Sequence, residues 1–188
     1  MKFFKKSLGQ NFLIDKNITR KIVDLTTVKD KNIVEIGPGK GALTEELLKK
    51  NPKSLTLIEK DYELYKLLIK KYKLKKKIRV INSDVLNYNF NKIKKKKIIV
   101  FGNLPYNISS QILIKFLKLK NLETKIDDFI FMFQKELGEK IIGKFPSKNY
   151  GRLSIITNLK LTIVKKFLVS ANCFFPKPKV TSMVIHFK

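Results

Sequence analysis

The segment from Glu35 to Gly41 constrains the fold of this chain most, because it places three glycines in a turn directly after a run of apolar residues. Residues 32–36 are short and apolar enough to form a buried strand, and residues 42–50 have the composition of a helix. Glycine lets the backbone turn sharply and lets a ligand approach it closely. The order of strand, glycine turn and helix therefore predicts a βα unit with a ligand site at the turn.

The same alternation continues along the chain and predicts an α/β fold. We expect a helix capped by Asp15 before the first strand and a later helix capped by Ser109. Further strands are expected at 54–58, 78–82, 97–101, 126–133, 161–169 and 180–187, and further helices at 62–72 and from Gln134. A proline-containing loop joins the last two strands, which indicates an antiparallel hairpin. The pattern predicts a seven-stranded, mostly parallel sheet with helices on both faces and this hairpin at its C-terminal end.

Length and composition favour one globular domain, since 188 residues that are 44% hydrophobic can build a sizeable core. No apolar run reaches about eighteen residues, and residues 1–6 are followed by polar ones, so we expect a soluble, cytoplasmic protein without membrane contact. Cys173 is the only cysteine and His186 the only histidine, so no metal site is expected. We also expect a monomer.

The charge of the chain is strongly positive, with 41 Lys and Arg against 15 Asp and Glu and a net charge of +26. Such a chain attracts polyanions at long range, and RNA, DNA or an acidic membrane surface would each satisfy that. Only Arg20, Arg79 and Arg152 are arginine, although recognition surfaces usually favour the arginine fork. A general compositional drift towards lysine explains the excess equally well.

Ligands of such sheets bind outside the carboxyl ends of the strands, and acidic residues stand at two of these ends. Glu59 closes the second strand, where its carboxylate can accept hydrogen bonds from both ribose hydroxyls. Asp84 follows the third strand and can accept from an adenine amine, although a helix cap or an Asx turn would also explain it. Gly37, Gly39 and Ala42 also fit the dinucleotide fingerprint, so the turn alone separates neither NAD from S-adenosylmethionine nor a ligand site from a purely structural turn.

The segment Asn103-Leu104-Pro105-Tyr106 follows the fourth strand and suits the methylation of an adenine amine. This amine is a poor nucleophile, and a site activates it by accepting both of its hydrogens, here with the Asn103 side-chain oxygen and the Leu104 carbonyl. Pro105 stiffens the turn, and Tyr106 offers a ring on which an extruded base can stack. No strong general base is required. A simple β-turn is the alternative.

The basic residues fall into two groups, those that precede strands and those that flank the expected mouth of the site. The lysine runs at 73–77 and 92–97 precede strands, so we place them at the edge opposite the site, as solvated loops. Residues better placed to steer RNA flank the expected mouth of the site: Lys2, Lys5, Lys6, Lys40, Lys60, Lys148, Arg152, Lys177 and Lys179.

Together these motifs resemble the ribosomal RNA adenine dimethyltransferase family, most closely its small-subunit dimethyladenosine transferase branch. The similar segments are residues 7–13, the glycine turn, 103–109, 134–136, 150–154 and 175–180. The resemblance implies a Rossmann-like class I methyltransferase that uses S-adenosylmethionine. It also implies transfer of two methyl groups to each of two adjacent adenines, in a hairpin near the 3′ end of small-subunit RNA, on an assembling subunit.

The resemblance assigns further site residues. Phe174 or Phe175 would face Tyr106 across the target base, although either phenylalanine can instead be a core residue. Leu13 can serve both core and site. Members usually carry a small helical domain after the final strand, whereas this sequence ends at Lys188, so we expect a catalytic domain over 1–188 without that tail. Residues that would close over the methionine end of the cofactor, joining Gly37, Gly39, Glu59, Asp84 and Asn103, are Gln10, Asn11 and Leu13.

Three alternative functions stay open. The large-subunit branch methylates another ribosomal adenine and confers antibiotic resistance, but residues 150–154 and 175–180 resemble the small-subunit branch more. A non-catalytic RNA-binding assembly factor would not need Asn103 and Tyr106. A DNA adenine methyltransferase shares the site chemistry, but the sequence shows no inserted target-recognition domain.

Overall fold

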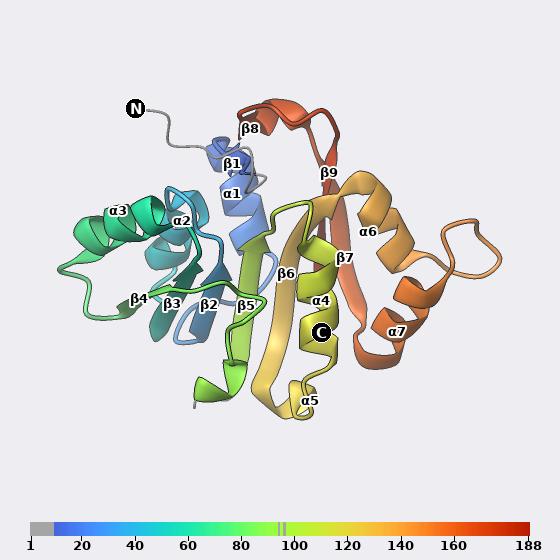
Figure 1. Ribbon diagram of the computed structural model, residues 1–188, viewed down its shortest axis with the longest axis horizontal. Coiled ribbons are helices and arrows are strands. Elements are labelled where there is room, and N and C mark those ends of the chain that lie inside the picture. The colour runs from blue at the N-terminus through green and yellow to red at the C-terminus, as the bar shows by residue number, and fades with distance from the viewer. Residues whose placement is uncertain (1–9, 94, 96) are drawn as a thin grey trace.

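The computed structural model describes residues 10–93, 95 and 97–188, and within these ranges a seven-stranded sheet forms the centre of the molecule (Figure 1). The strand order is β4-β3-β2-β5-β6-β9-β7. The strands are β2 (Asn32–Ile36), β3 (Ser54–Glu59), β4 (Ile78–Asn82), β5 (Ile98–Asn103), β6 (Ile126–Gln134), β7 (Ile163–Val169) and β9 (Ser182–Phe187). The predicted α/β sheet is therefore confirmed.

The pairing of the strands places the carboxyl ends of β2 to β6 at one edge. These five strands pair in parallel, whereas β9 runs antiparallel to both β6 and β7, as the predicted hairpin requires. The chain moves outward from β2 in one direction through β3 and β4, and in the other through β5 and β6. Such a reversal of strand order opens a crevice for ligands outside the carboxyl ends of the two central strands.

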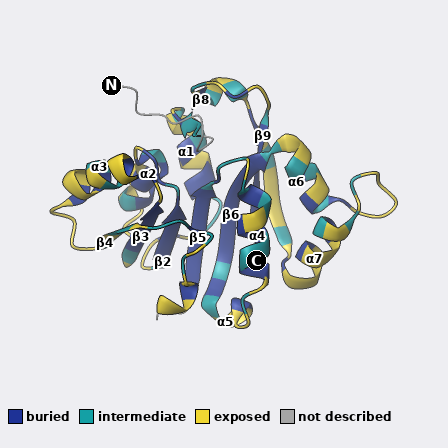
Figure 2. Ribbon diagram, viewed as in Figure 1, coloured by how far each residue is buried: buried dark blue, intermediate teal, exposed yellow. Residues whose placement is uncertain are grey.

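Helices cover both faces of the sheet and bury it from two sides. One core packs Ile22 of α1, Leu47 of α2 and Leu68 of α3 on one face, and the other packs Phe116 of α4 and Ile141 of α6 on the opposite face. Figure 2 shows the inner strands β2, β3, β5, β6 and β9 largely buried, whereas the edge strands β4 and β7 and the outer sides of the helices are more exposed. The helices are α1 (Lys16–Val23), α2 (Ala42–Lys49), α3 (Tyr62–Tyr72), α4 (Ser109–Leu117), α5 (Leu122–Lys125), α6 (Lys135–Ile142) and α7 (Arg152–Lys160).

Two helix starts test the capping predictions. Asp15 caps α1 as expected, because its carboxylate accepts from the backbone amides of Asn17 and Ile18. The expected cap at Ser109 is wrong: Ser109 is the first residue of α4, Ile108 precedes it, and the Ser109 hydroxyl donates to the Tyr106 carbonyl at 3.2 Å. The serine therefore ties the helix to the turn before it instead of capping the helix.

Several elements were not predicted. The helix α7 was missed because its apolar residues do not gather on one face, and Ile155, Ile156 and Leu159 are exposed. The four-residue helix α5 and a two-stranded antiparallel sheet of β1 (Phe12–Leu13) and β8 (Phe174–Phe175) were also missed. Strands of two residues carry no periodic signal in a sequence. None of the helices in the described ranges is long and apolar enough to cross a membrane.

Candidate active site

A pocket of about 610 Å³ opens at the carboxyl edge of the sheet, where the strand order reverses. Its size suits a ligand as large as a nucleoside derivative. Its wall brings together segments that the sequence alone only places near one edge: 10–14, 35–43, 58–60, 83–85, 103–108 and Phe175.

The glycine turn forms the floor of this pocket in a conformation that suits glycine. Gly39 has a φ of 58°, in the left-handed region, and a Cβ at this position would lie 2.9 Å from the ring of Phe12. The Gly39 amide donates to Glu59 at 3.1 Å, and the Gly37 amide donates to the Ile58 carbonyl at 3.0 Å. The turn is therefore held against the end of β3 from one side and covered by Phe12 from the other.

Glu59 holds the turn and also lines the pocket. Its carboxylate accepts from the backbone amides of Gly39 and Asp61, and only 6% of the residue is exposed. Burial raises the pKa of Glu59 above its usual value, although the hydrogen bonds from Asp61 and Gly39 lower it. A group that accepts two amide hydrogens still has lone pairs for hydroxyl donors, so the ribose-binding role predicted for it agrees with this geometry.

Asp84 shows the Asx turn that the sequence left as an alternative. Its Oδ1 accepts from the Leu86 amide at 2.9 Å, and its Oδ2 accepts from the Lys60 ammonium at 2.8 Å. Burial alone raises the pKa of Asp84, but the hydrogen bonds from Lys60 and Leu86 outweigh it and lower the pKa. Because Asp84 also lines the pocket, a ligand amine there would share Oδ2 with Lys60.

The N-terminal segment closes the pocket over Asn103. The Asn103 side-chain amide donates to the Asn11 carbonyl at 2.9 Å, and nothing in the described part of the chain donates to its Oδ1. Gln10 donates to Asp61 at 3.3 Å, and Leu13 is buried in the core while it also lines the pocket. The amide of Asn103 is thus oriented with its nitrogen engaged, which leaves its oxygen as an acceptor.

Tyr106 is anchored by β9, which lies two strands away from β5 in the sheet. Its hydroxyl lies 2.6 Å from that of Ser182, which is fully buried at the start of β9. Burial raises the pKa of Tyr106, so the phenol stays protonated at neutral pH. Leu104 is buried, and it lines the pocket beside Pro105. The hydrogen bond to Ser182 holds the ring of Tyr106 at the pocket.

The structure separates the two phenylalanines proposed as a base clamp. Phe174 is buried in the core and does not line the pocket, whereas Phe175 is 57% exposed and does. Adjacent residues of a strand point to opposite faces, so one of the two had to turn away from the site. Of the two, only Phe175 lines the pocket together with Tyr106.

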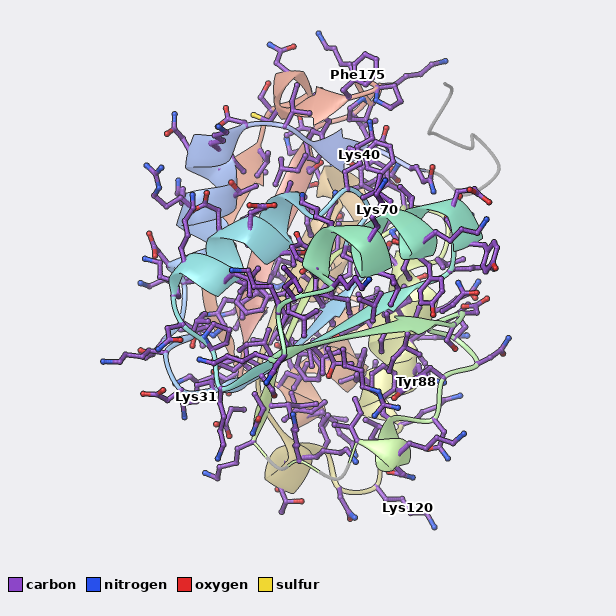
Figure 3. The ribbon with its side chains drawn as sticks, turned by 90° about the vertical axis from the view of Figure 1, so that its left-hand side faces the viewer. Lys31, Lys40, Lys70, Tyr88, Lys120 and Phe175 are labelled. Atoms are coloured by element: carbon purple, nitrogen blue, oxygen red, sulfur yellow. The ribbon has the colours of Figure 1, made fainter. Side chains whose placement is uncertain are left out.

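Of the basic residues expected at the mouth of the site, Lys40 and Lys60 line the pocket. Lys177 and Lys179 are exposed just after β8 and do not line it. Figure 3 shows Lys40 and Phe175 towards one end of the molecule and Lys120 at the other. Lys2, Lys5 and Lys6 lie outside the described residues.

Two other basic residues do not line the pocket. Arg152 begins α7, which lies away from the glycine turn in Figure 1, and Lys148 lies in the loop before that helix. Their part in steering RNA stays a prediction. Lys95 donates to Ser54 at the start of β3, which confirms the edge assigned to this lysine of the run at 92–97, whereas Lys94 and Lys96 lie outside the described residues.

Several residues that shape the site escaped the sequence analysis. Lys71 donates to the Lys40 carbonyl at 3.1 Å, and a Cβ on Gly41 would lie 2.5 Å from the Tyr72 hydroxyl, so the end of α3 supports the glycine turn. No spacing in the sequence signals this contact. Glu35 did give a signal, as an acid within an apolar strand: its burial raises its pKa to about 8 despite a hydrogen bond from Thr44.

Comparison with known proteins assigns the chain to a family. A family model described as ribosomal RNA adenine dimethylase matches residues 1–188, the whole chain. The chain belongs to the ribosomal RNA adenine dimethylase family. It is 45% identical over 183 residues to ribosomal RNA small subunit methyltransferase A of Pelagibacter ubique, an alignment that spans 97% of this chain and 69% of that one. Identity to the protein of the same name from Malacoplasma penetrans is 43% over 190 residues, spanning 100% and 67%.

Two solved structures show the fold of this dimethylase chain. A dimethyladenosine transferase from Plasmodium falciparum matches with a TM-score of 0.80 and 30% identity, over 94% of this chain and 62% of that one. The 23S rRNA methyltransferase ErmE matches with a TM-score of 0.79 and 28% identity, over 95% and 69%. The two TM-scores hardly differ, so the backbone does not separate the branches, whereas sequence identity favours the small-subunit one.

Proposed function

We propose that this protein transfers methyl groups from S-adenosylmethionine to the exocyclic amines of two adjacent adenines, two to each, in a hairpin near the 3′ end of small-subunit ribosomal RNA. It acts as a monomer on an assembling small subunit in the cytoplasm. Family membership supports the reaction, and 45% identity to a small-subunit methyltransferase supports the choice of RNA. The observation that carries the proposal is the orientation of Asn103 in the pocket.

Asn103 and Leu104 make the adenine amine more reactive. The lone pair of an adenine amine is delocalised into the ring, so the nitrogen reacts only if its hydrogens are drawn out of the ring plane. The Asn103 Oδ1 accepts one hydrogen, and the Leu104 carbonyl accepts the other. The nitrogen becomes acidic once it is methylated and cationic, so its proton passes to water and the chain needs no strong base.

Tyr106 and Phe175 hold the extruded base between them. The Tyr106 ring lies at the pocket because Ser182 anchors its hydroxyl, and Phe175, which is exposed, lines the same pocket. Stacking on an aromatic ring stabilises a flipped base whatever its sequence context. The two rings therefore orient the amine towards Asn103 without reading neighbouring bases.

The pocket fits S-adenosylmethionine by its volume and by its polar groups. When bound, S-adenosylmethionine supplies an electrophilic methyl group on its sulfonium sulfur. Glu59 accepts from the ribose hydroxyls, and Asp84 accepts from the adenine amine through the Oδ2 that it shares with Lys60. Gly39 leaves the backbone open beside the ligand. Residues that close over the methionine end are Gln10, Asn11 and Leu13.

One experiment tests the reaction and its substrate together. The protein is incubated with labelled S-adenosylmethionine and, separately, unmethylated small subunits, large subunits or DNA, and the modified nucleoside is identified. We expect dimethyladenosine in small-subunit RNA alone. Label in large-subunit RNA would instead favour the second candidate, which the TM-score of 0.79 to ErmE supports. Absence of S-adenosylmethionine binding in calorimetry would refute the enzyme and leave only an RNA-binding role.

A further inference from the structure

A second concavity lies outside the active site, between α1 and the edge strand β7. Four cations line it: Arg20 and Lys21 from the helix, and Lys165 and Lys166 from the strand. We propose that this groove binds the phosphate backbone of the RNA that flanks the target base. The proposal rests on the proposed function, and it extends that function from the reacting base to the surrounding RNA.

The charge of the groove is not compensated within the protein. In the described part of the chain, Asp24 is the only acid that lines the groove, and it forms an ion pair with Lys50 at 2.6 Å. Among the described residues, no carboxylate forms an ion pair with the side chain of Arg20, Lys165 or Lys166. Positive groups that converge in a hollow without acidic partners attract a polyanion more strongly than the same charges on a flat surface.

Some lysines of other surfaces do have acidic partners. On α2 and α3, Lys49 pairs with Glu46 and Lys66 with Glu63, one turn away on the same helix. Such pairs are typical of a solvated helix face. The groove instead sets cations of two elements opposite one another, and one of them is Arg20, in a chain with only three arginines. The planar guanidinium binds a phosphate with two hydrogen bonds, which an ammonium does not.

The lysines of β7 stand on an exposed edge strand. The register of β7 with β9 shifts between Ile163 and Lys165, and the residues from Val164 to Lys166 are all exposed. Lysines on an edge strand also prevent pairing with other chains, but edge protection does not explain why Arg20 stands on the facing helix. The Lys21 ammonium lies 4.3 Å from the centre of the Phe167 ring, which holds it in the groove.

The groove leads away from the mouth of the active site. The helix α1 begins shortly after β1, and β7 leads through one short turn to β8. Because β1 and β8 pair with each other, and Ile14 donates to the Cys173 carbonyl at 2.9 Å, both walls of the groove start from the segment that carries Phe175. An RNA strand whose base lies against Phe175 can therefore continue along the groove.

The test compares two triple variants of equal charge change. The groove variant carries Arg20→Gln, Lys165→Gln and Lys166→Gln. The control carries Lys70→Gln, Lys73→Gln and Lys75→Gln, which are exposed on and after α3, beside the opposite edge of the sheet. Affinity for transcribed, unmethylated small-subunit RNA is measured over a range of salt concentrations, and calorimetry with S-adenosylmethionine checks that both variants fold.

The logarithm of the association constant falls linearly with the logarithm of the salt concentration, and the loss of three phosphate contacts makes this slope less steep by about 2 to 3. We expect that reduction, with an affinity loss on the order of tenfold or more at low salt, in the groove variant only. Equal affinities and slopes for the two variants would overturn the groove. The proposal would also be overturned if the groove variant lost binding to anionic vesicles but bound the RNA as the wild type does. If the wild type binds the RNA but transfers no methyl group, the proposed function fails while the difference between the variants still decides the groove.

Discussion

The hydrogen bond between Tyr106 and Ser182 allows a prediction that separates the stacking of a ring from the anchoring of its hydroxyl. Tyr106→Phe keeps the ring and removes the bond to a serine that is 0% exposed. A buried hydroxyl left without a partner costs about 1–3 kcal/mol. Ser182→Ala costs less, about 0.5–1.5 kcal/mol, because Tyr106 is only partly buried and its hydroxyl can bind water.

The double variant, Tyr106→Phe with Ser182→Ala, tests this reasoning through its free energy of unfolding. Removing both hydroxyls leaves no unsatisfied group, so its cost falls short of the sum of the single costs by about 1 kcal/mol. The chain has no tryptophan, so urea unfolding is followed by circular dichroism. Strictly additive single costs would show that the two hydroxyls do not interact in solution.

Methyl transfer by the same variants tests the role of the ring. We expect Tyr106→Phe to retain turnover within about tenfold of the wild type, since stacking is preserved and a tenfold change corresponds to about 1.4 kcal/mol. Tyr106→Ala loses stacking, which contributes about 1–3 kcal/mol per base, and falls by a further factor of about ten to a hundred. Equal losses in Tyr106→Phe and Tyr106→Ala would refute the stacking role and assign the function to the hydroxyl.

The remaining predictions concern the turn, the strand before it and the reacting segment. Gly39→Ala should weaken S-adenosylmethionine binding at least about tenfold in calorimetry, because a φ of 58° and the Phe12 ring both oppose a Cβ. The raised pKa of Glu35, about 8, means that the native state keeps a proton which the unfolded state releases above its ordinary pKa of 4.5. The stability of the wild type should therefore fall on the order of 1 kcal/mol per pH unit between these values, and Glu35→Gln should flatten that slope in urea titrations. Asn103→Ala should lower turnover by about two or more orders of magnitude, and wild-type turnover would remove Asn103 from the mechanism.

Local patterns account for the parts of the fold that were predicted. The glycine turn, the strand at 32–36 and the helix at 62–72 follow from apolar spacing and from residues that start or stop an element. The helix α7 has no such spacing, and its burial depends on contacts with α4 and α6. Its absence from the prediction also explains why Arg152 was placed at the mouth.

Patterns in the sequence predict most of the strands and helices in their order along the chain, and with them the edge at which Gly37, Glu59, Asp84 and Asn103 meet, because hydrophobic periodicity and glycine turns act over a few residues. How these residues are held follows instead from contacts between distant segments. Asn103 is oriented by a carbonyl 92 positions away and Tyr106 by a hydroxyl 76 positions away. Such contacts depend on how distant segments pair, as β1 does with β8, and no local pattern records that pairing.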